Sequence, residues 1–294
     1  MNVLVSGSSG MIGSAITAAL QKDGHNVYPL LRNKREGPFY YLQKTNYIHL
    51  DRSIELDVVI NLAGSNISQN RWTSRVKKNI LDSRVKTTQT LCNALSELPQ
   101  KPHSLLSASA IGYYGTHPSE IFSEFSSAGK DFLSQVAINW ERATAPAEES
   151  GIRTCHLRFG LVLSPQGGLI NNLLLPLRLA TVGVIGSGNQ MISWISLCDA
   201  ITVMKAIIDK PSFSGPINLT SNQPASNREL IQTLSSAIKR PALPRMPGKL
   251  IQILFGEMAD AALLSGAHVI SERVKELEID LEHKTLSVCL DKIM

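Results

Sequence analysis

The first 160 residues alternate between short apolar runs and longer stretches in which apolar residues recur every three or four positions. The short runs are rich in valine, isoleucine and leucine and predict strands near 2–6, 25–31, 46–50, 57–62, 103–109 and 153–159. The longer stretches predict helices near 11–22, 72–97 and 131–150. This alternation favours an α/β fold in which helices cover both faces of a parallel, doubly wound sheet.

Three glycines, Gly7, Gly10 and Gly13, lie at the junction between the first predicted strand and the first predicted helix. A phosphate can approach backbone amides only where no side chain intervenes, and the first turn of a helix offers unpaired N–H groups and a positive dipole end. The spacing therefore indicates a Rossmann domain that holds a dinucleotide pyrophosphate, although a glycine-rich turn without a ligand is the alternative. The predicted contacts are Gly7, Ser9, Gly10, Met11, Ile12 and Gly13.

The end of the second predicted strand indicates which dinucleotide is bound. NAD-binding Rossmann domains place an acidic residue there, whereas this chain has Arg32. An arginine offers charge-assisted donors to a 2′-phosphate, so NADP(H) is favoured over NAD, unless Arg32 simply faces solvent. Asp51 follows the third predicted strand and either accepts from the adenine amino group or is an ordinary turn aspartate.

Small residues at later strand ends are further candidates for the cofactor wall, because they let a cofactor lie against the backbone. Arg84, on the helix that follows, either reaches the cofactor or forms a buried salt bridge. The predicted contacts in this group are Leu62, Ala63, Gly64, Asn79, Arg84, Ser107 and Ala108. Parallel strands open onto one carboxyl edge, so Gly7, Arg32, Gly64 and Ser109 are expected to converge on one crevice.

After about residue 160 the pattern changes to short pieces punctuated by glycine and proline. We therefore expect residues 1–165 to form an NADP-binding Rossmann domain, which a segment near 195–220 continues. Residues 166–294 are expected to form a smaller lobe on the substrate side, interleaved with it. With 43% hydrophobic and 18% charged residues, the chain can bury a full core.

Charge and cysteine content exclude several function classes. The net charge of +5 comes from scattered residues, so nucleic acid is not an expected partner. No apolar run approaches the roughly 20 residues of a bilayer span, and a soluble, unprocessed, cytoplasmic protein is expected. The four cysteines have no metal-ligand spacing and lie among apolar residues, as buried free thiols do, so no metal is expected. They are Cys92, Cys155, Cys198 and Cys289.

Together with the run 107–115, these residues resemble the extended short-chain dehydrogenase/reductase superfamily, and more narrowly its atypical epimerase family branch. Motifs spread over nearly the whole chain carry the narrower resemblance. They are 61–64, 71–72, 82–84, 113–115, 140–141, 158–163, 175–176, 186–188, 193–195 with Asp199, 256–258 and 264–266. The resemblance implies an NADP-binding Rossmann domain with a small C-terminal lobe, a cofactor contact at Gly160, and a poorly defined physiological reaction.

The chain departs from the superfamily at its catalytic pair. Members that move a hydride use a tyrosine and a lysine four residues apart, the lysine lowering the pKa of the phenol. The corresponding positions here are Leu133 and Ala137, and neither exchanges a proton. Ser109 matches the superfamily's catalytic serine, and Tyr113 is a nearby phenol. The alternative is that these residues form a small strand end and packing aromatics.

The sequence therefore predicts an NADP(H)-dependent oxidoreductase or epimerase-like protein that acts on an unknown small molecule. An NADP(H)-binding sensor or regulatory protein without turnover is the alternative, because the catalytic pair is missing. Arg178 and Trp194 are expected either to face the cleft or to pack between the lobes. The resemblance is compatible with a homodimer through the helices near 72–97 and 131–150, because superfamily members often pair this way.

Overall fold

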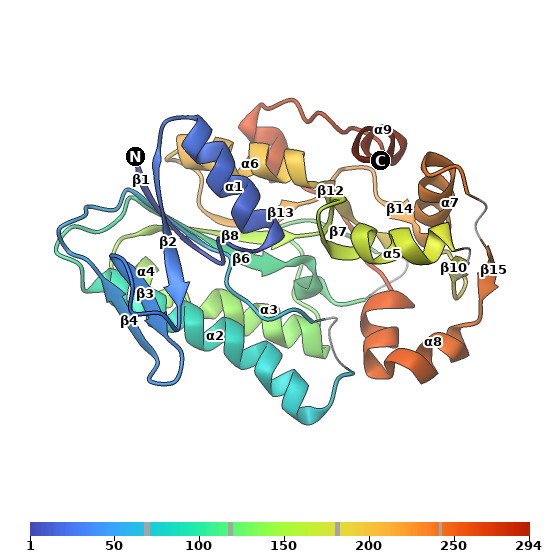
Figure 1. Cartoon of the computed structure of the whole chain (residues 1–294), viewed down its shortest axis with the longest axis horizontal. Coiled ribbons are helices and arrows are strands. Elements are labelled where there is room, and N and C mark those ends of the chain that lie inside the picture. The colour runs from blue at the N-terminus through green and yellow to red at the C-terminus, as the bar shows by residue number, and fades with distance from the viewer. Residues whose placement is uncertain (68–70, 117–119, 180–182, 241–242) are drawn as a thin grey trace.

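One sheet organises most of the chain, which is described here from a computed structural model covering residues 1–67, 71–116, 120–179, 183–240 and 243–294. Within these residues the sheet has eight strands in the order β13-β8-β6-β5-β1-β2-β3-β4 (Figure 1). Their bounds are β1 Asn2–Ser6, β2 Asn26–Arg32, β3 Phe39–Leu42, β4 Tyr47–Leu50, β5 Val58–Asn61, β6 Ser104–Ala110, β8 Arg153–Phe159 and β13 Gly215–Leu219.

Neighbouring strands in this sheet are parallel, apart from the pair formed by β3 and β4. The third strand predicted near 46–50 exists as β4, but it runs antiparallel. The strand that follows β2 in the parallel direction is instead β3, whose Phe39 and Tyr41 are buried. The chain therefore leaves β4 in the direction of the amino edge of the sheet, away from the edge at which the parallel strands end.

Helices cover both faces of the sheet, as the alternating pattern predicts. On one face lie α1 (Met11–Lys22) and α6 (Leu197–Asp209), and on the other α2 (Ser74–Ser96), α3 (Phe132–Arg142) and α4 (Ala145–Glu149) (Figure 1). Ile16 and Leu20 of α1 are almost completely buried against the first face, and Leu91 and Leu95 of α2 against the second. Each such side chain contributes about 1.5–3 kcal/mol by leaving water.

The helix predicted over 131–150 is divided into α3 and α4. Pro146 lies in the first turn of α4, where its missing N–H is tolerated, but within a continuous helix it would remove a hydrogen bond and clash with the preceding turn. Thr144 marks the break, and its hydroxyl donates to the Glu141 carbonyl.

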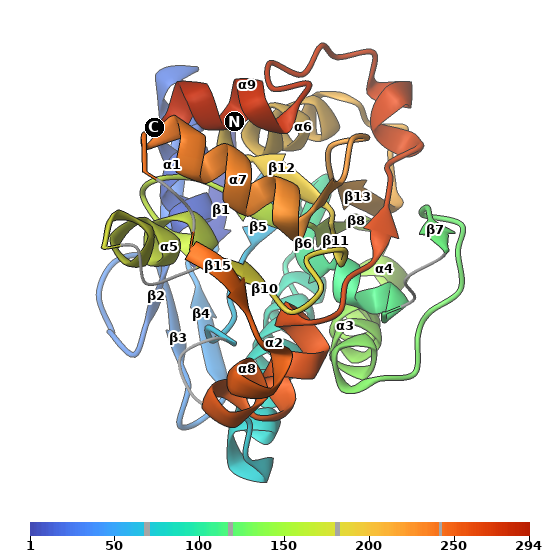
Figure 2. The same ribbon diagram turned by 90° about the vertical axis from the view of Figure 1, so that its right-hand side faces the viewer.

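Most of the remaining elements lie beside the carboxyl edge of the sheet (Figure 2), and β9, α5, β10, β12, α7 and α9 share a core of their own. Trp194 and Ile231 are completely buried in this core. The helices and helical turns are α5 Gly168–Arg178, α7 Asn227–Ala237, α8 Gly248–Phe255, α9 Leu286–Ile293, η1 Ile111–Tyr114, η2 Ala259–Leu263 and η3 Arg273–Leu277. The short strands are β7 Ile121–Phe122, β9 Leu161–Leu163, β10 Gly183–Ile185, β11 Met191–Ile192, β12 Trp194–Ser196, β14 Ala225–Ser226, β15 Leu243–Met246 and β16 His268–Val269. Across the described part of the chain, the helices are too short or too polar to cross a bilayer.

Candidate functional site

The turn between β1 and α1 is shaped by glycines that have no room for a side chain. Gly7 has a φ of +70°, and a Cβ on it would lie 2.8 Å from the Leu62 carbonyl oxygen. A Cβ on Gly13 would lie 2.1 Å from the Gly7 carbonyl oxygen. Gly10 caps α1 without a side-chain hydrogen bond, so the first-turn amides remain available. The turn therefore has the form of a cradle for a phosphate group, which we call the phosphate cradle (residues 7–13).

The neighbouring parallel strands end at the same edge as β1. Ser6 is in register with Leu30 of β2 and with Asn61 of β5, and Asn61 is in register with Ser107 of β6. Arg32, the last residue of β2, is exposed, so its guanidinium is accessible to a ligand at this edge. The predicted contacts that the structure brings together here are Gly7, Ser9, Gly10, Met11, Ile12, Gly13, Arg32, Leu62, Ala63 and Gly64.

Arg84 holds the loop after β5 through carbonyl oxygens, so its contacts among the described residues differ from the alternative of a buried salt bridge. Its guanidinium donates to the carbonyl oxygens of Ile80 and Ser65, at 3.0 Å each, and lies over the Trp140 ring. It also lies beside Gly64, where a Cβ would be 3.3 Å from the guanidinium carbon. Burial lowers the pKa of Arg84 to about 10. A partly buried cation at this loop is therefore a direct neighbour of the predicted cofactor wall.

The remaining predicted contacts of the cofactor wall differ in their burial. They are Ser107, Ala108 and Asn79. Ser107 and Ala108 are buried within β6, and the Ser107 hydroxyl accepts a hydrogen bond from the Asn61 amide. Their backbone, rather than their side chains, therefore borders the edge. Asn79 is exposed on α2. One turn later, the Ser83 hydroxyl accepts from the Ser65 backbone amide, at 3.2 Å.

The geometry at Asp51 favours the turn over the adenine contact. Its carboxylate accepts from both the backbone amide and the hydroxyl of Ser53, and these hydrogen bonds lower the pKa of Asp51. Asp51 also follows the antiparallel β4, so its prediction at the end of a parallel third strand is corrected.

The glycine at position 160 has a packing reason. A Cβ on Gly160 would lie 2.6 Å from the Ser193 carbonyl oxygen and 2.8 Å from the Thr220 methyl carbon. The absence of a side chain lets β8, β12 and β13 approach one another here. This close approach accounts for the glycine without a cofactor contact.

Ser109 belongs to a buried polar network at the end of β6. Its hydroxyl donates to the Glu141 carboxylate at 2.7 Å, and only 2% of the residue is exposed. The same carboxylate accepts two hydrogen bonds from Arg158, whose guanidinium also donates to the Tyr114 hydroxyl. Burial alone would lower the pKa of Arg158, but the hydrogen bonds and charge of Glu141 raise it. Ser109 is thus held by protein partners.

Tyr113 packs against the Arg158 guanidinium, which lies 3.5 Å from the ring centre. The Tyr114 hydroxyl, in turn, donates to the Asn218 side-chain oxygen at 2.7 Å. The catalytic roles of Ser109 and Tyr113 stay predictions, and these contacts favour the alternative of a packed strand end.

The two positions that correspond to the superfamily's catalytic pair lie on α3. Leu133 packs against Gly112, on which a Cβ would lie 3.3 Å from the Leu133 Cβ, and Ala137 is buried. Glu141 follows on the same helical face, one turn beyond Ala137. This face therefore presents an apolar side chain, a methyl group and a paired carboxylate, with no phenol or amine.

Beside these residues, a cavity of about 520 Å³ separates the sheet from the smaller part of the chain. We call it the interlobe cavity. Ile111 and Gly112 form its wall on the side of β6, and Leu133 contributes from α3. Helices α5 and α7 contribute Leu173 and Leu230 from the other side. The cavity therefore adjoins the edge of the sheet at which the phosphate cradle lies.

The predicted cleft residues Arg178 and Trp194 do not line this cavity. Arg178 is exposed at the end of α5. Trp194 is completely buried, and its indole donates to the Gln223 carbonyl oxygen at 2.9 Å. Trp194 is thus a core residue.

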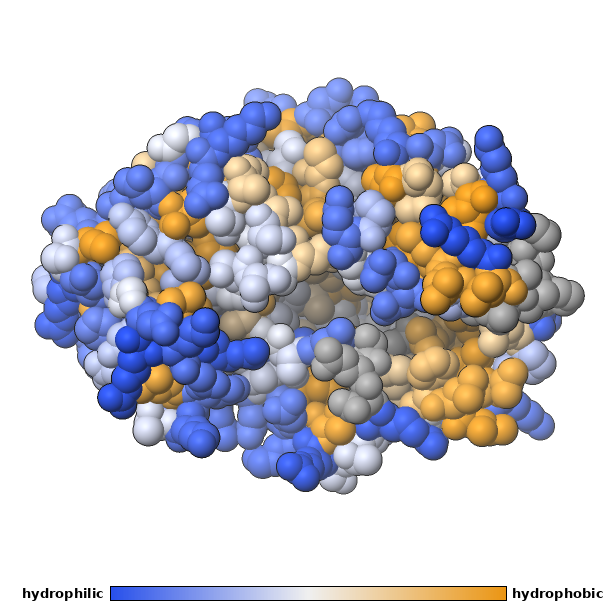
Figure 3. Space-filling model, in the orientation of Figure 1, coloured by the Kyte–Doolittle hydropathy of each residue, from blue (hydrophilic) through white to orange (hydrophobic). Residues whose placement is uncertain are grey.

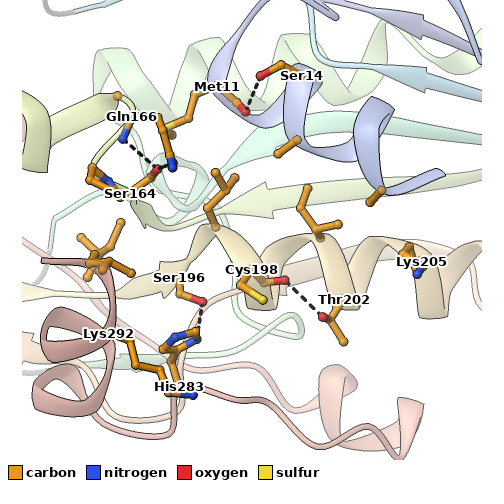
Figure 4. Close-up of a pocket in the computed structure, with 18 of the residues that line it drawn as sticks. Met11, Ser14, Ser164, Gln166, Ser196, Cys198, Thr202, Lys205, His283 and Lys292 are labelled. Carbon is orange, nitrogen blue, oxygen red and sulfur yellow. Dashed lines mark hydrogen bonds between the residues drawn. The ribbon is translucent and has the colours of Figure 1, made fainter. Parts of the chain in front are cut away.

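A second cavity, of about 1040 Å³, lies between α1, α6 and α9 (Figure 4). Ser196 and His283 line this cavity and form a hydrogen-bonded cluster with Asp199. The Asp199 carboxylate accepts from the Ser196 hydroxyl and from the backbone amides of Glu282 and His283, and His283 Nδ1 lies 3.1 Å from it. These bonds fasten the segment before α9 to the first turn of α6. No signal in the sequence links Asp199 with His283, because 84 positions separate them.

The family model for the NAD dependent epimerase/dehydratase family matches residues 3–219, which include the phosphate cradle and, apart from Asn2, the whole sheet. The chain belongs to this family. Curated members resemble it over nearly its full length. "Epimerase family protein Mb2239" of Mycobacterium bovis is 36% identical and the match covers 98% of this chain and 96% of that protein. "Epimerase family protein YfhF" of Bacillus subtilis is 34% identical over 88% of this chain and 87% of that protein.

Solved structures show the same fold. The human epimerase family protein SDR39U1, crystallised with NADPH, is 31% identical and superposes with a TM-score of 0.90, covering 100% of this chain and 99% of that one. The UDP-glucuronic acid 4-epimerase of Bacillus cereus, in complex with NAD, has a TM-score of 0.75 at 19% identity, covering 99% and 96% of the two chains. Its likeness concerns the fold. This member of the epimerase/dehydratase family thus combines the family fold with an α3 face on which Leu133 and Ala137 replace a phenol and an amine.

Proposed function

We propose that the chain binds NADP(H) across the carboxyl edge of the sheet and acts as an oxidoreductase or epimerase-like enzyme on a small molecule in the interlobe cavity. The observation that carries the proposal is the phosphate cradle, whose glycines leave room for nothing but backbone and whose first-turn amides are available. The NADPH complex of SDR39U1, a relative with 31% identity, supports it.

Each contact at the edge has a defined task in this proposal. The amides of Met11, Ile12 and Gly13 hold the pyrophosphate, and the exposed Arg32 binds the 2′-phosphate with planar, charge-assisted donors. Arg84 fixes the loop of Gly64 and Ser65, so that this loop forms a firm wall. When bound, NADP(H) supplies a hydride donor or acceptor at its nicotinamide ring.

The choice between NADP(H) and NAD(H) is tested by replacing Arg32. Titrations of NADPH and NADH, followed by cofactor fluorescence, are expected to show at least about tenfold tighter binding of NADPH by the wild type. Arg32→Ala is expected to remove most of this difference without weakening NADH. Arg35→Ala, in the exposed segment that follows, is the matched control and keeps the wild-type preference. Equal affinity of the wild type for both cofactors would reject the assignment of Arg32.

A second candidate function is an NADP(H)-binding sensor without turnover, favoured by the face of α3. Leu133 and Ala137 stand where a phenol and an amine would move the proton. The sensor predicts tight, stoichiometric NADPH binding with no loss of NADPH absorbance at 340 nm across a panel of carbonyl compounds. Oxidation of NADPH by any of these compounds favours the enzyme instead. In that case Ser109→Ala tests the predicted catalytic serine. This substitution is expected to lower turnover and to leave cofactor affinity unchanged.

Three further expectations belong to this proposal. The boundary near 165 divides the cofactor domain from the substrate lobe, with β13 returning to the sheet. The buried thiols Cys92, Cys155 and Cys289 suit a reducing, cytoplasmic setting.

A homodimer would form through α2 and α3, which lie together on the outer side of the sheet (Figure 1). Light scattering of the purified chain distinguishes a dimer from a monomer.

A further inference from the structure

The interlobe cavity has an apolar lining. Side chains of leucine, isoleucine, methionine and alanine come from both sides of it. They are Ile67, Ile111, Leu133, Leu161, Leu169, Leu173, Ile185, Met191, Ile192, Leu230, Ile231, Ala261, Leu263 and Ala267. Its volume of about 520 Å³ lies within the range of small-molecule sites. Such a lining binds a ligand mainly by removing apolar surface from water.

Charge is scarce in this lining. Among the described residues that line the cavity, Asp131 is the one ionisable side chain. Its carboxylate caps α3, accepting from the Ser134 amide at 2.8 Å and from the Ser134 hydroxyl at 2.9 Å. The sequence also has no lysine or arginine in the segments outside the described residues, 68–70, 117–119, 180–182 and 241–242. An anionic ligand would therefore meet a carboxylate and no cation from this lining.

Several polar side chains of the lining are already bonded within the protein. The Gln190 amide donates to the carbonyl oxygens of Ile185 and Leu263. The Ser193 hydroxyl donates to the Ala267 carbonyl oxygen, and the Asn227 side-chain oxygen accepts from the Ile185 amide. These groups hold the walls together and have fewer hydrogen bonds left to offer a ligand.

The helices that begin at the cavity provide few additional groups that could bind an anion. Asp131 occupies the start of α3 with a negative charge, and the Ser226 hydroxyl caps α7 by accepting from the Glu229 amide. Helix α5 begins at Gly168 without a side-chain cap. A Cβ on the preceding residue, Gly167, would lie 3.2 Å from the Met11 sulfur, so this start lies beside the phosphate cradle. Its dipole therefore acts next to the proposed cofactor site.

Helices α5 and α8 also expose apolar side chains on the surface. Leu175 and Leu179 of α5 are each 64% exposed, and Ile253 and Leu254 of α8 are 69% and 52% exposed. Figure 3 shows a hollow in this face of the molecule with apolar side chains along its right-hand border, where Figure 1 places α5 and α8. Exposed apolar patches of this kind mark sites that bind apolar partners.

We propose that the interlobe cavity takes an uncharged, predominantly apolar substrate and excludes sugar nucleotides. A nucleoside diphosphate sugar carries two negative charges on its diphosphate, and burying them without a cation is costly. The Bacillus cereus fold relative, by contrast, was crystallised in complex with UDP-glucuronic acid. The inference rests on the proposed function, because NADP(H) at the adjoining edge makes this cavity the place of the substrate.

The test uses N-phenyl-1-naphthylamine, a neutral apolar probe whose fluorescence rises on leaving water, with the full-length chain in the presence and absence of NADPH. The wild type is expected to bind the probe saturably with one site. UDP-glucuronic acid at about 1 mM is expected neither to displace the probe nor to bind when titrated by calorimetry. Displacement of the probe by UDP-glucuronic acid, or its binding, at or below about 1 mM would overturn the proposal.

Leu173→Lys places a cation in the cavity wall at a partly buried position on α5. It is expected to weaken probe binding at least about tenfold, because an unpaired ammonium is held in an apolar lining. Val288→Lys makes the same change on the exposed side of α9, away from the cavity, and is expected to bind the probe like the wild type. Wild-type probe affinity in Leu173→Lys would place the probe elsewhere and contradict the inference.

Titration with NADPH separates this inference from the proposed function. Leu173→Lys is expected to bind NADPH like the wild type, which also shows that the variant is folded. If the wild type binds no NADPH but the probe pattern holds, the cofactor proposal fails and the apolar cavity stands. If NADPH binds and UDP-glucuronic acid binds in the cavity, the cofactor proposal stands and the apolar substrate is rejected.

Discussion

Gly13 is the residue of the phosphate cradle that leaves the least room. We expect Gly13→Ala to weaken NADPH binding at least about tenfold and to lower the free energy of unfolding by about 1–3 kcal/mol. The reason is that the new Cβ would lie 2.1 Å from the Gly7 carbonyl oxygen, so the turn must move. Cofactor titration and urea unfolding measure the two effects.

Ala18→Gly is the control for this change. Ala18 is exposed on the same helix, and glycine there costs about 1 kcal/mol of stability without touching the cradle. We expect this variant to bind NADPH like the wild type. If Gly13→Ala also binds NADPH like the wild type, the cradle does not hold the cofactor.

The buried phenol of Tyr114 is expected to make the free energy of unfolding depend on pH. Burial raises the pKa of Tyr114 from 10.0 to about 12, although Arg158 lowers it in part. Between these pH values the unfolded chain releases the phenol proton and the folded chain keeps it, so the free energy of unfolding falls as pH rises. Tyr114→Phe lacks this proton, and its stability is expected to fall less steeply over that range.

At pH 8 the same variant is expected to be less stable by about 1–2 kcal/mol, because Asn218 and Arg158 lose a hydrogen-bond partner. Urea midpoints at pH 8 and at pH values above 10 measure both effects. Parallel pH profiles for Tyr114→Phe and the wild type would show that the phenol titrates equally in both states.

The role of a single residue is predictable from the sequence where the backbone geometry requires that residue type. It is less predictable where a side chain can choose among several partners. The glycines of the phosphate cradle are needed because other backbone atoms approach them closely, and glycine at these positions is visible in the sequence. The Asp51 carboxylate instead accepts a hydrogen bond from Ser53, two residues away, and Arg84 donates one to a loop carbonyl.

Cys198 corrects the expectation of four buried thiols, since it is exposed with its sulfur beside Glu282. Partial desolvation of its sulfur raises the pKa of this thiol, and the neighbouring Glu282 carboxylate raises it further.

At the scale of elements, Asp199 joins α6 to the segment before α9. We expect Asp199→Asn to lower the free energy of unfolding by about 2 kcal/mol, because asparagine keeps one acceptor oxygen and places an NH2 donor where the second carboxylate oxygen accepts. Amide hydrogen exchange is expected to rise in residues 278–294. The measurement is hydrogen exchange followed by mass spectrometry, together with urea unfolding.

Glu229→Gln is the matched change on α7. Glu229 holds the equivalent place three residues after a capping serine, but it is exposed. This variant is expected to stay within about 0.5 kcal/mol of the wild type. Unchanged exchange at 278–294 in Asp199→Asn would show that other contacts hold the segment.

Most of the sheet and the helices near 11–22 and 72–97 were predictable, because apolar periodicity is strong over long elements. The strand β3 was missed, since four residues with two tyrosines carry little periodic signal. Its omission reversed the inferred direction of the next strand. The helix predicted over 131–150 is too long, because apolar periodicity continues across Pro146 whereas the backbone starts a new helix there.

At the scale of the whole molecule, the sequence predicts the shared edge of the parallel strands but not the cavity beside it. Parallel connections place the ends of β1, β2, β5 and β6 together regardless of side-chain detail. The interlobe cavity instead depends on how α5, α7 and η2 pack against η1 and α3, and such contacts between distant segments leave no local pattern. Its apolar lining therefore became visible only with the structure.

The place of β13 at the outer border of the sheet affects how the chain is made. Its partner β8 ends at Phe159, whereas β13 begins at Gly215, after the chain has passed through β9 to β12, α5 and α6. At 5–20 residues per second, a ribosome needs roughly 3–11 s to produce the intervening segment. During this interval β8 presents unpaired amides and carbonyls to its surroundings, so newly synthesised chains pass through a stage in which chaperone binding competes with aggregation.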